Sequence, residues 1–379
     1  MVQIDHPHSR QPWLLAFTFY FATSASGLVG CAKSPSTPSL LPDTGPAPRG
    51  RLRVSQGKIL DGEDRQAVLR GLSLGAIWSV KGLGRWNEAY FANARAWGAE
   101  MVRVPVFPFT FQFQREETLR DLDDAMTWCE RQNLYLIIDY HMIGNATQSL
   151  CLCEEHVTWD DFADFWGTVA ARYADRPTLA FADIYTEPVA LDLANGWEWS
   201  DYRQHADAIV ALIRQKAPKL IPVLGGMDYC YDLSPGGERP FSDPDVVLAA
   251  HPFPGTARAS RLAAWENNFG YLSARYAFLL EFGFDPDDSG GYRDDLSYGR
   301  QIVGYAAERN MSWTAFVFHK EEGWPMPLFS DWDTLTPTVS GQFFKDVLAG
   351  QPLETAGTTA SDGVPDGGAT SIDGGESAG

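Results

Sequence analysis

The chain has 379 residues, enough for one large domain or two smaller ones. Hydrophobic residues make up 45% and charged residues 21%, proportions that are typical of a globular protein and exclude wholesale disorder. The formal net charge of −19 argues against nucleic acid as a partner, because the phosphate backbone repels an acidic surface, whereas a neutral polymer meets no such repulsion.

The first 30 residues have the features of an export signal. Arg10 precedes an apolar run at residues 12–23, which has the length of a signal-peptide core and is too short for a confident membrane span. The run is followed by Leu28-Val29-Gly30-Cys31, which resembles a bacterial lipobox. We therefore predict a lipoprotein signal at residues 1–30, acylation of Cys31 and a lipid-anchored place in the cell envelope. An ordinary signal peptide, and hence a secreted protein, is the alternative.

Two segments of biased composition flank the expected domain. Residues 31–50 comprise the lipidated cysteine and a Pro/Ser-rich linker, which we expect to act as a spacer. Residues 352–379 are rich in Gly, Ser, Thr and Asp, contain no Lys or Arg, and are expected to form a disordered tail. The folded domain is therefore predicted at residues 51–351, a size that is typical of a barrel.

Strand-like runs recur through this domain. A hairpin is expected first, at residues 52–60, with a turn at Asp61-Gly62. Several of the runs that follow are continuously apolar, as is typical of strands buried on both faces of a sheet. The eight runs cover residues 67–73, 101–105, 134–139, 179–185, 220–225, 246–251, 277–282 and 312–318.

Helical patterns lie between most of these runs. Gly98 follows the first of them, where a C-terminal cap is expected. The Pro- and Gly-rich segment at residues 233–245 shows no clear helix. Repeated alternation predicts a single (β/α)8 TIM barrel with an N-terminal β-hairpin. A doubly wound sheet is the alternative, but no Gly-rich phosphate loop follows the first strand. The helical patterns cover residues 86–97, 117–132, 162–173, 202–217, 269–276, 296–309 and 342–348.

Four cysteines fall inside the expected domain. Cys151 and Cys153 lie in an expected loop, from which one of them could reach Cys230, and export makes a disulfide permissible. Cys129 lies in a helical pattern and is expected to be a buried thiol. No Cys/His spacing resembles a zinc site, so we predict no metal.

Polar side chains gather where the expected strands end, and in a barrel of this kind the chemistry lies at those ends. Glu187 follows the fourth strand, and Glu281 lies in the seventh, where an unpaired charge in an apolar run would be costly. Two carboxylates in one cavity suit glycosidic cleavage, in which one protonates the leaving oxygen and the other stays ionised. Arg103 would keep its partner carboxylate charged. The spacing does not assign the two roles. Further candidates at strand ends are Trp78, His141, Thr186, His251, Phe253, Trp313 and Phe316.

These motifs, in this order, resemble glycoside hydrolase family 5, the cellulase-type family of retaining (β/α)8 barrels. The resemblance extends from about Leu52 to Leu348 and so covers the whole expected domain. It is carried by Leu69-Arg70-Gly71, Val102-Arg103-Val104-Pro105, Ile138-Asp139-Tyr140-His141, Thr186-Glu187-Pro188, His251-Pro252-Phe253 and Glu281-Phe282-Gly283.

The resemblance implies a double displacement without a cofactor. Glu187 would be the general acid/base and Glu281 the nucleophile, with the two carboxyl groups ~5 Å apart. Arg103 would hydrogen-bond Glu281, and His141 and His251 would border the cleaved sugar. The implied substrate is a β-linked polysaccharide, with β-1,4-glucan expected before mannan or xylan, and nothing suggests more than a monomer.

Three positions depart from the family pattern. Thr186 stands where the family has an Asn that hydrogen-bonds the sugar 2-hydroxyl; a Thr hydroxyl can still donate, so reduced activity is expected. Phe253 stands where a Tyr hydroxyl touches the nucleophile. Trp313 or Phe316 would take the place of a Trp under the sugar, and register favours Phe316. Trp78 could be a further sugar platform. A non-hydrolytic glycan-binding barrel is therefore the alternative, and a purely structural envelope protein is a third hypothesis.

Overall fold

The computed structural model describes residues 48–152, 156–190, 197–238, 240–254, 261–270, 277–287, 292–320 and 326–351. The predicted signal peptide, Cys31, most of the predicted linker, the predicted tail and Cys153 lie outside the described residues. Within the described ranges, no helix combines the length and the apolar character needed to cross a bilayer.

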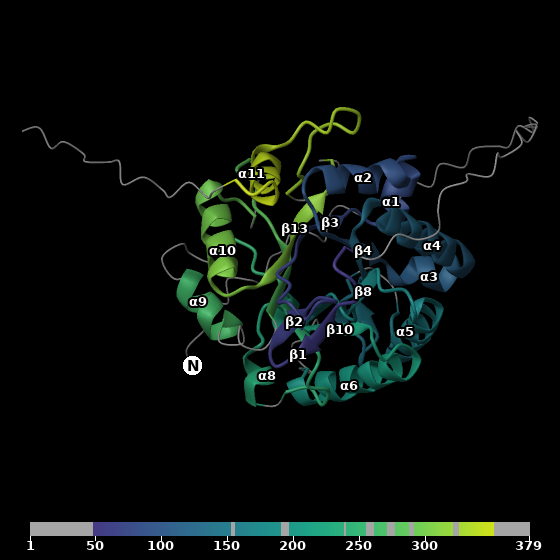
Figure 1. Ribbon diagram of the computed structural model, residues 1–379. Coiled ribbons are helices and arrows are strands. Elements are labelled where there is room, and N and C mark those ends of the chain that lie inside the picture. Colours follow the sequence, from purple (N-terminus) through teal and green to yellow (C-terminus); the bar gives the residue numbers. More distant parts are fainter. Residues whose placement is uncertain are drawn as a thin grey trace, which may run out of the picture.

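Eight parallel strands close into a barrel (Figure 1). Each barrel strand pairs with the barrel strand that follows it along the chain, and the last barrel strand pairs with the first. This closure confirms the predicted TIM barrel and excludes a doubly wound sheet. The predicted N-terminal hairpin is present as β1 (Arg53–Ser55) and β2 (Lys58–Leu60). The barrel strands are β3 (Arg70–Leu74), β4 (Met101–Val106), β5 (Tyr135–Tyr140), β8 (Leu179–Asp183), β10 (Ile221–Gly225), β11 (Val247–Ala250), β12 (Ala277–Phe282) and β13 (Ser312–Phe318).

Helices surround the barrel (Figure 1). Gly98 follows α2 with a φ of +100°, as the predicted C-terminal cap requires. The described helix of this crossover is α9, which ends at Asn268, and most of the helix predicted at residues 269–276 lies outside the described residues. The described helices are α1 (Ile77–Gly82), α2 (Glu88–Ala96), α3 (Pro108–Phe113), α4 (Arg115–Gln132), α5 (Trp159–Tyr173), α6 (Trp199–Lys216), α7 (Met227–Cys230), α8 (Ser234–Glu238), α9 (Arg261–Asn268), α10 (Leu296–Glu308) and α11 (Val339–Leu348).

Two separate apolar layers hold the barrel together. Successive strand side chains point to opposite faces, so one set fills the barrel and the other packs on the helices. The inner set includes Met101 and Ile137, which cluster with Leu52 and Ile59 of the N-terminal hairpin. The hairpin therefore extends the inner cluster at the amino-terminal end of the strands, and polar side chains are left to the opposite end.

Two register shifts alter this alternation near the carboxyl ends. One lies between Leu279 and Phe282 of β12, and the other between Ala315 and Phe318 of β13. Leu280 belongs to the inner apolar cluster and Phe282 to the outer one, while Glu281 between them also turns inward. The irregularity thus adds a carboxylate to the barrel interior.

The cysteines differ in part from expectation. Cys129 is a buried free thiol, as predicted. Cys230 is also a buried free thiol, so the link that Cys151 or Cys153 could have made to Cys230 is absent. Its sulfur belongs to the inner apolar cluster and lies 3.4 Å from the carbonyl oxygen of Ala249. Cys151 takes part in a disulfide that does not involve Cys230.

Candidate active site

Arg103 is the centre of a polar layer above the inner apolar cluster. It lies on β4 and is fully buried. Its Nε donates to Asp183 at 2.7 Å, its Nη2 lies 3.0 Å from Asp139, and its Nη1 donates to Glu281. One guanidinium thus meets carboxylates from β8, β5 and β12, using the planar array of donors that only arginine offers.

The charges of this layer perturb one another. Burial alone would lower the pKa of Arg103, but attraction to Asp139, Glu281 and Asp183 raises it overall, so the guanidinium stays charged. Burial raises the pKa of Asp183 to about 7, and repulsion from Asp139 and Glu281 offsets the opposing attraction of Arg103. Near neutral pH, both the protonated and the ionised form of Asp183 are therefore populated.

Glu187 and Glu281 lie close together beside His251. The Nδ1 atom of His251 lies 3.0 Å from Oε1 of Glu187 and 3.9 Å from Oε2 of Glu281. Oxygens of the two carboxylates approach within 4.8 Å of each other. Burial, and then the charge of Glu281, raises the pKa of Glu187 well above its usual range. Burial, with Arg103 and His141, lowers the pKa of His251, so this imidazole is neutral at pH 7.

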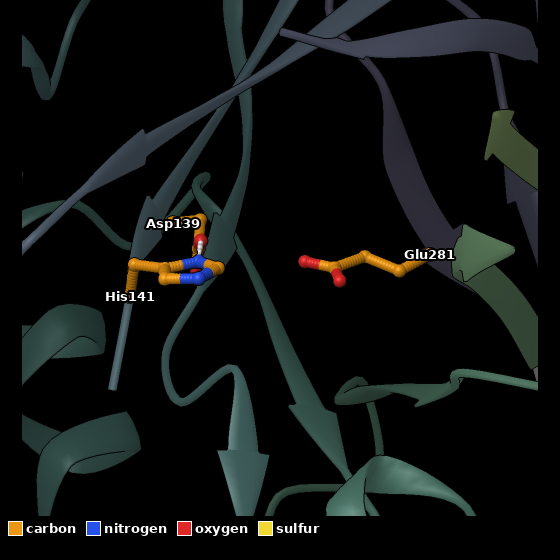
Figure 2. Close-up of side chains that lie close together, drawn as sticks. All are labelled: Asp139, His141 and Glu281. Carbon is orange, nitrogen blue, oxygen red and sulfur yellow. Dashed lines mark hydrogen bonds and ion pairs between the residues drawn. The ribbon is translucent and has the colours of Figure 1, made fainter. Parts of the chain in front are cut away.

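Glu281 points across the site toward His141 and Asp139, and Asp139 contacts a ring nitrogen of His141 (Figure 2). The distance between His141 Nδ1 and Asp139 Oδ2 is 2.7 Å. The second oxygen of Asp139 accepts the Thr186 hydroxyl proton at 2.6 Å. A hydroxyl has one proton, so in this arrangement Thr186 can only accept a hydrogen bond from a sugar. For Thr186 to donate to a sugar, as predicted from the sequence, this hydroxyl would have to turn away from Asp139.

A small sheet outside the barrel holds the backbone of Glu187. The amide of Glu187 donates to the Met142 carbonyl at 3.0 Å, and the amide of Val189 donates to the Gly144 carbonyl at 3.0 Å. Glu187 is thereby anchored to the loop that follows β5. The three strands of this sheet, in spatial order, are β7 (Leu150–Cys151), β6 (Ile143–Asn145) and β9 (Glu187–Pro188).

Tyr185 ties the same loop to the strand that carries Glu187. Its hydroxyl donates to the Gly144 carbonyl at 2.7 Å and accepts from the Ala146 amide at 3.2 Å. Gly144 has a φ of +152°, and a Cβ there would lie 2.1 Å from the Leu150 carbonyl oxygen. Only glycine fits this position without moving the hairpin formed by β6 and β7.

An aromatic cluster borders His251. The Phe253 ring lies 6.4 Å from the His251 ring, 5.2 Å from Tyr292 and 6.3 Å from Phe316, measured between centroids. Phe316 is buried on the inner side of β13. Trp313 packs instead on the outer face of β13, in the layer between the barrel and the helices, where it contacts Phe282 of β12 and Phe344 of α11. The structure thus brings Phe253 and Phe316 to the site and leaves Trp313 out, as strand alternation dictates.

Trp78 lies at the rim of the site, at the start of α1, with 37% of its surface exposed. Its ring packs on Phe107 at 6.1 Å and on Phe109 at 6.0 Å. Phe107 in turn contacts His141 at 4.5 Å. A continuous row of rings therefore leads from the exposed Trp78 to the buried centre.

The donor set suits proton transfer better than metal binding. Two groups bring ligand-type atoms within 4.8 Å of one another: Asp139 with His141 and Glu281, and Glu187 with His251 and Glu281. Arg103 contacts Asp139 and Glu281, and its charge would repel a cation held by either group. Among the described residues we therefore assign no metal or cofactor site.

The sequence places Asp139 in a strand-end motif without indicating its role, and it does not reveal three further participants. Asp183 is hidden in an apolar strand whose other side chains fill the core. Phe107 follows directly after β4, where the strand-end rule could have found it. Tyr292 lies in the segment after β12, and nothing in its local sequence marks it.

Comparison with known proteins agrees with this geometry. The sequence model of the cellulase family (glycosyl hydrolase family 5) matches residues 60–322. Endoglucanase E-5 of Thermobifida fusca is 22% identical over 296 residues, covering 74% of this chain and 59% of that protein. Endoglucanase A of Evansella cellulosilytica is 22% identical over 232 residues, covering 60% of this chain and 44% of that protein. The chain thus spans about half the length of these curated relatives.

Solved structures show the same architecture. A β-glucanase from Saccharophagus degradans superposes with a TM-score of 0.75 at 25% identity, covering 85% of this chain and 98% of the other. The same enzyme has been solved in complex with cellotetraose. The family match includes both glutamates and covers well over half of the sequence. The chain therefore belongs to the cellulase family, glycosyl hydrolase family 5.

Proposed function

We propose that this protein is a retaining glycosidase that cleaves internal β-linkages of a glucan, with Glu187 as general acid/base and Glu281 as nucleophile. The observation that carries the proposal is the approach of their carboxylate oxygens within 4.8 Å. A separation of about 5–5.5 Å suits direct attack by one carboxylate, whereas inversion through an intervening water needs about 6.5–9.5 Å.

In the first step, an oxygen of Glu281 attacks the anomeric carbon while Glu187 protonates the departing oxygen. The raised pKa of Glu187 supplies the proton near neutral pH, and the neutral His251 orients this carboxyl through Nδ1. Arg103 holds Oε1 of Glu281, so that Oε2 faces the side where Glu187 and His251 lie. The glycosidic C–O bond breaks and an ester forms at Glu281.

In the second step, Glu187 takes a proton from a water molecule that attacks the same carbon. The ester bond to Glu281 breaks, and Glu281 leaves as a carboxylate that Arg103 receives. Two inversions at one carbon return the original configuration. The reaction needs water alone as co-substrate.

A β-glucan is the proposed substrate for three reasons. The curated relatives are endoglucanases, and the cellotetraose complex places a β-glucan fragment in a protein with this fold. The row of rings from Trp78 to His141 offers faces on which sugar rings stack. The acidic chain disfavours an anionic polymer and tolerates a neutral one.

The test is release of reducing ends by the purified full chain from β-1,4-glucan, mixed-linkage β-glucan, mannan and xylan. Glu281→Gln is the matched control, because it preserves size and removes the nucleophile. We expect release from a glucan by the parent alone, and NMR should show the β-anomer as the first product. An α-anomer first would refute the retaining mechanism, and no release from any polymer would refute the hydrolase.

Glycan binding without hydrolysis is the second candidate. It is favoured by Thr186, whose proton is given to Asp139, and by Phe253, which has no hydroxyl to offer Glu281. This candidate predicts that cellohexaose binds with equal affinity to the parent and to Glu281→Gln, with no products after prolonged incubation. Calorimetry and chromatography of the same sample distinguish the two functions.

We further propose that the protein is exported and anchored to the cell envelope as a monomer through acylated Cys31. The support is the lipobox-like Leu28-Val29-Gly30-Cys31 after an apolar run. Expression in a bacterial host with labelled palmitate should label the parent and not Cys31→Ala. Equal labelling of both would refute acylation at this cysteine.

A further inference from the structure

We propose that Asp183 is a positioning residue for the reaction: its carboxylate fixes the guanidinium of Arg103, and Arg103 then presents Nη1 to Glu281. The inference rests on the proposed function, because it assumes that Glu281 is the nucleophile. Asp183 itself is buried, with 1% of its surface exposed, and therefore acts without touching the substrate.

The geometry gives Asp183 control of one edge of the guanidinium. Asp183 Oδ2 accepts from Nε of Arg103 at 2.7 Å. Asp139 lies 3.0 Å from Nη2, and Glu281 accepts from Nη1. A planar guanidinium that is hydrogen-bonded at Nε and ion-paired at Nη2 has little freedom left at Nη1. Glu281 is thus oriented by two carboxylates that it does not contact directly.

The charges around Asp183 give it a second effect. Arg103 of β4 carries the positive charge, and Asp139 of β5 and Glu281 of β12 carry competing negative charges. In the part of the chain that the structure describes, Cys230 of α7 and Tyr202 of α6 also interact with Asp183, and burial raises the pKa of both side chains well above neutrality, so neither contributes a charge. An ionised Asp183 therefore offsets part of the charge of Arg103.

This balance extends to Glu187 through Arg103. The charge of Arg103 acts to lower the pKa of Glu187. When Asp183 ionises, part of that influence is neutralised, and Glu187 keeps its proton to a higher pH. Because the pKa of Asp183 is about 7, its ionisation takes place near neutral pH, where Glu187 must still carry its proton. In the acid range Asp183 is protonated, so its charge has no effect there.

Two substitutions separate orientation from charge. Asp183→Asn keeps the size and an acceptor facing Nε but removes the charge. We expect the alkaline limb of kcat/KM on glucan to move about one unit to lower pH, with the acid limb unchanged. Asp183→Ala removes both, and we expect kcat about 10²-fold lower at all pH values, with KM within about twofold, because Glu281 loses its orientation.

A chromogenic aryl β-cellobioside with a dinitrophenol leaving group separates the two glutamates, because its departure needs no proton from Glu187. The alanine variant should be slow on this substrate too, whereas the asparagine variant should lack the pH shift. Asp61→Asn is the control: this carboxylate is also buried and paired with an arginine, Arg65, but lies beside the N-terminal hairpin. Asp61→Asn should leave both the acid and the alkaline limb of the kcat/KM profile unchanged.

Circular dichroism and thermal melting establish that each variant is folded. Wild-type kinetics in both folded variants would overturn the role of Asp183, as would a uniform loss in both without the pH shift in Asp183→Asn. Loss of the fold in both would also overturn it, because the carboxylate would then serve the barrel rather than the reaction. A wild-type protein with no activity on glucan or aryl cellobioside would instead refute the proposed function.

Discussion

Thr186 is the residue whose chemistry depends most on a partner that the sequence does not reveal. Its hydroxyl donates to Asp139, which also holds Nδ1 of His141 and faces Nη2 of Arg103. Asp139 thus receives donors on both oxygens. Thr186 supports this carboxylate first and can meet a sugar hydroxyl only as an acceptor.

Substitution of Thr186 tests this assignment. Thr186→Val keeps the shape and leaves one Asp139 oxygen without its donor, which should cost about 1–3 kcal/mol of stability and lower kcat/KM on glucan about tenfold. Thr186→Ser keeps the hydroxyl and should remain within about twofold of the parent. Steady-state kinetics and thermal melting measure both effects. Equal kinetics of valine and serine variants would show that the hydroxyl bond to Asp139 has no part in catalysis.

Glu187 predicts how activity depends on pH. Its pKa is raised in the folded protein, so it remains a proton donor above its usual range, and activity is lost as pH rises through that value. The alkaline limb of kcat/KM on glucan should therefore be absent with a dinitrophenyl β-cellobioside, which needs no acid. Profiles with an identical alkaline limb for both substrates would assign that limb to another group.

At the scale of elements, the loop after β5 would belong to the proposed catalytic framework. The strands β6, β7 and β9 join this loop to Glu187, and Tyr185 adds two hydrogen bonds between them. A general acid needs a position accurate to a fraction of an ångström, so we propose that the β6–β7 hairpin serves the reaction although it contributes no reacting group.

Gly144→Ala tests the hairpin. A Cβ there would lie 2.1 Å from the Leu150 carbonyl oxygen, so either β7 or β6, the strand that pairs with Glu187, would have to move. We expect kcat about 10²-fold lower. Gly304→Ala in α10 is the matched control: nothing lies within 4 Å of its Cβ position, and the change should leave kinetics unchanged and raise stability slightly. Unchanged kinetics in Gly144→Ala would show that the β6–β7 hairpin has no part in catalysis.

The aromatic row on α1 and after β4 should bind distant sugars. Trp78→Ala removes its exposed end and should raise KM for cellohexaose about tenfold while leaving kcat within about twofold, because stacking is worth roughly 1–2 kcal/mol and lies away from the reacting bond. Leu83→Ala, which removes an exposed aliphatic residue just beyond α1, is the control. A loss confined to kcat would place Trp78 at the cleaved sugar instead.

Across the whole molecule, buried carboxyl groups make stability depend on pH. The pKa of Asp183 is about 7 in the folded protein against an ordinary value of 3.8, so the folded state binds the proton more tightly. The contribution of this carboxyl group to stability is therefore fully present below its unfolded pKa and is lost as pH rises from about 4 to about 7, a loss on the order of 4 kcal/mol. Glu187 acts in the same direction.

Thermal melting should show a lower midpoint at pH 8 than at pH 5, and Asp183→Asn should reduce the difference. Acidic side chains with lowered pKa values, such as Asp331, act in the opposite direction. Their contribution to the stability of the folded protein grows as pH rises, but only in a range below about 4. A midpoint that rises steadily from pH 5 to pH 8 would contradict the charge assignment in the polar layer.

The architecture could be predicted from the sequence because it depends on local patterns. The bounds of β12 and β13 match their apolar runs, since strands buried on both faces are continuously apolar. The inward turn of Glu281 depends on a register shift between strands, and sequence alternation alone would not reveal it. The short β6–β7 hairpin has no apolar alternation, and the partners of Asp183 come from strands far away along the chain.

The pairing of β6 with β9 also bears on how such a protein can change. Loops at the mouth of a barrel usually vary independently of the strands, and this independence lets one scaffold acquire new substrates. Here the loop after β5 shares a sheet with Glu187, the proposed proton donor, so we expect a library randomised over residues 143–151 to disturb turnover together with substrate choice. Residues 76–83, on α1, have no such pairing with Glu187, and a new specificity could be selected there at lower risk to the chemistry.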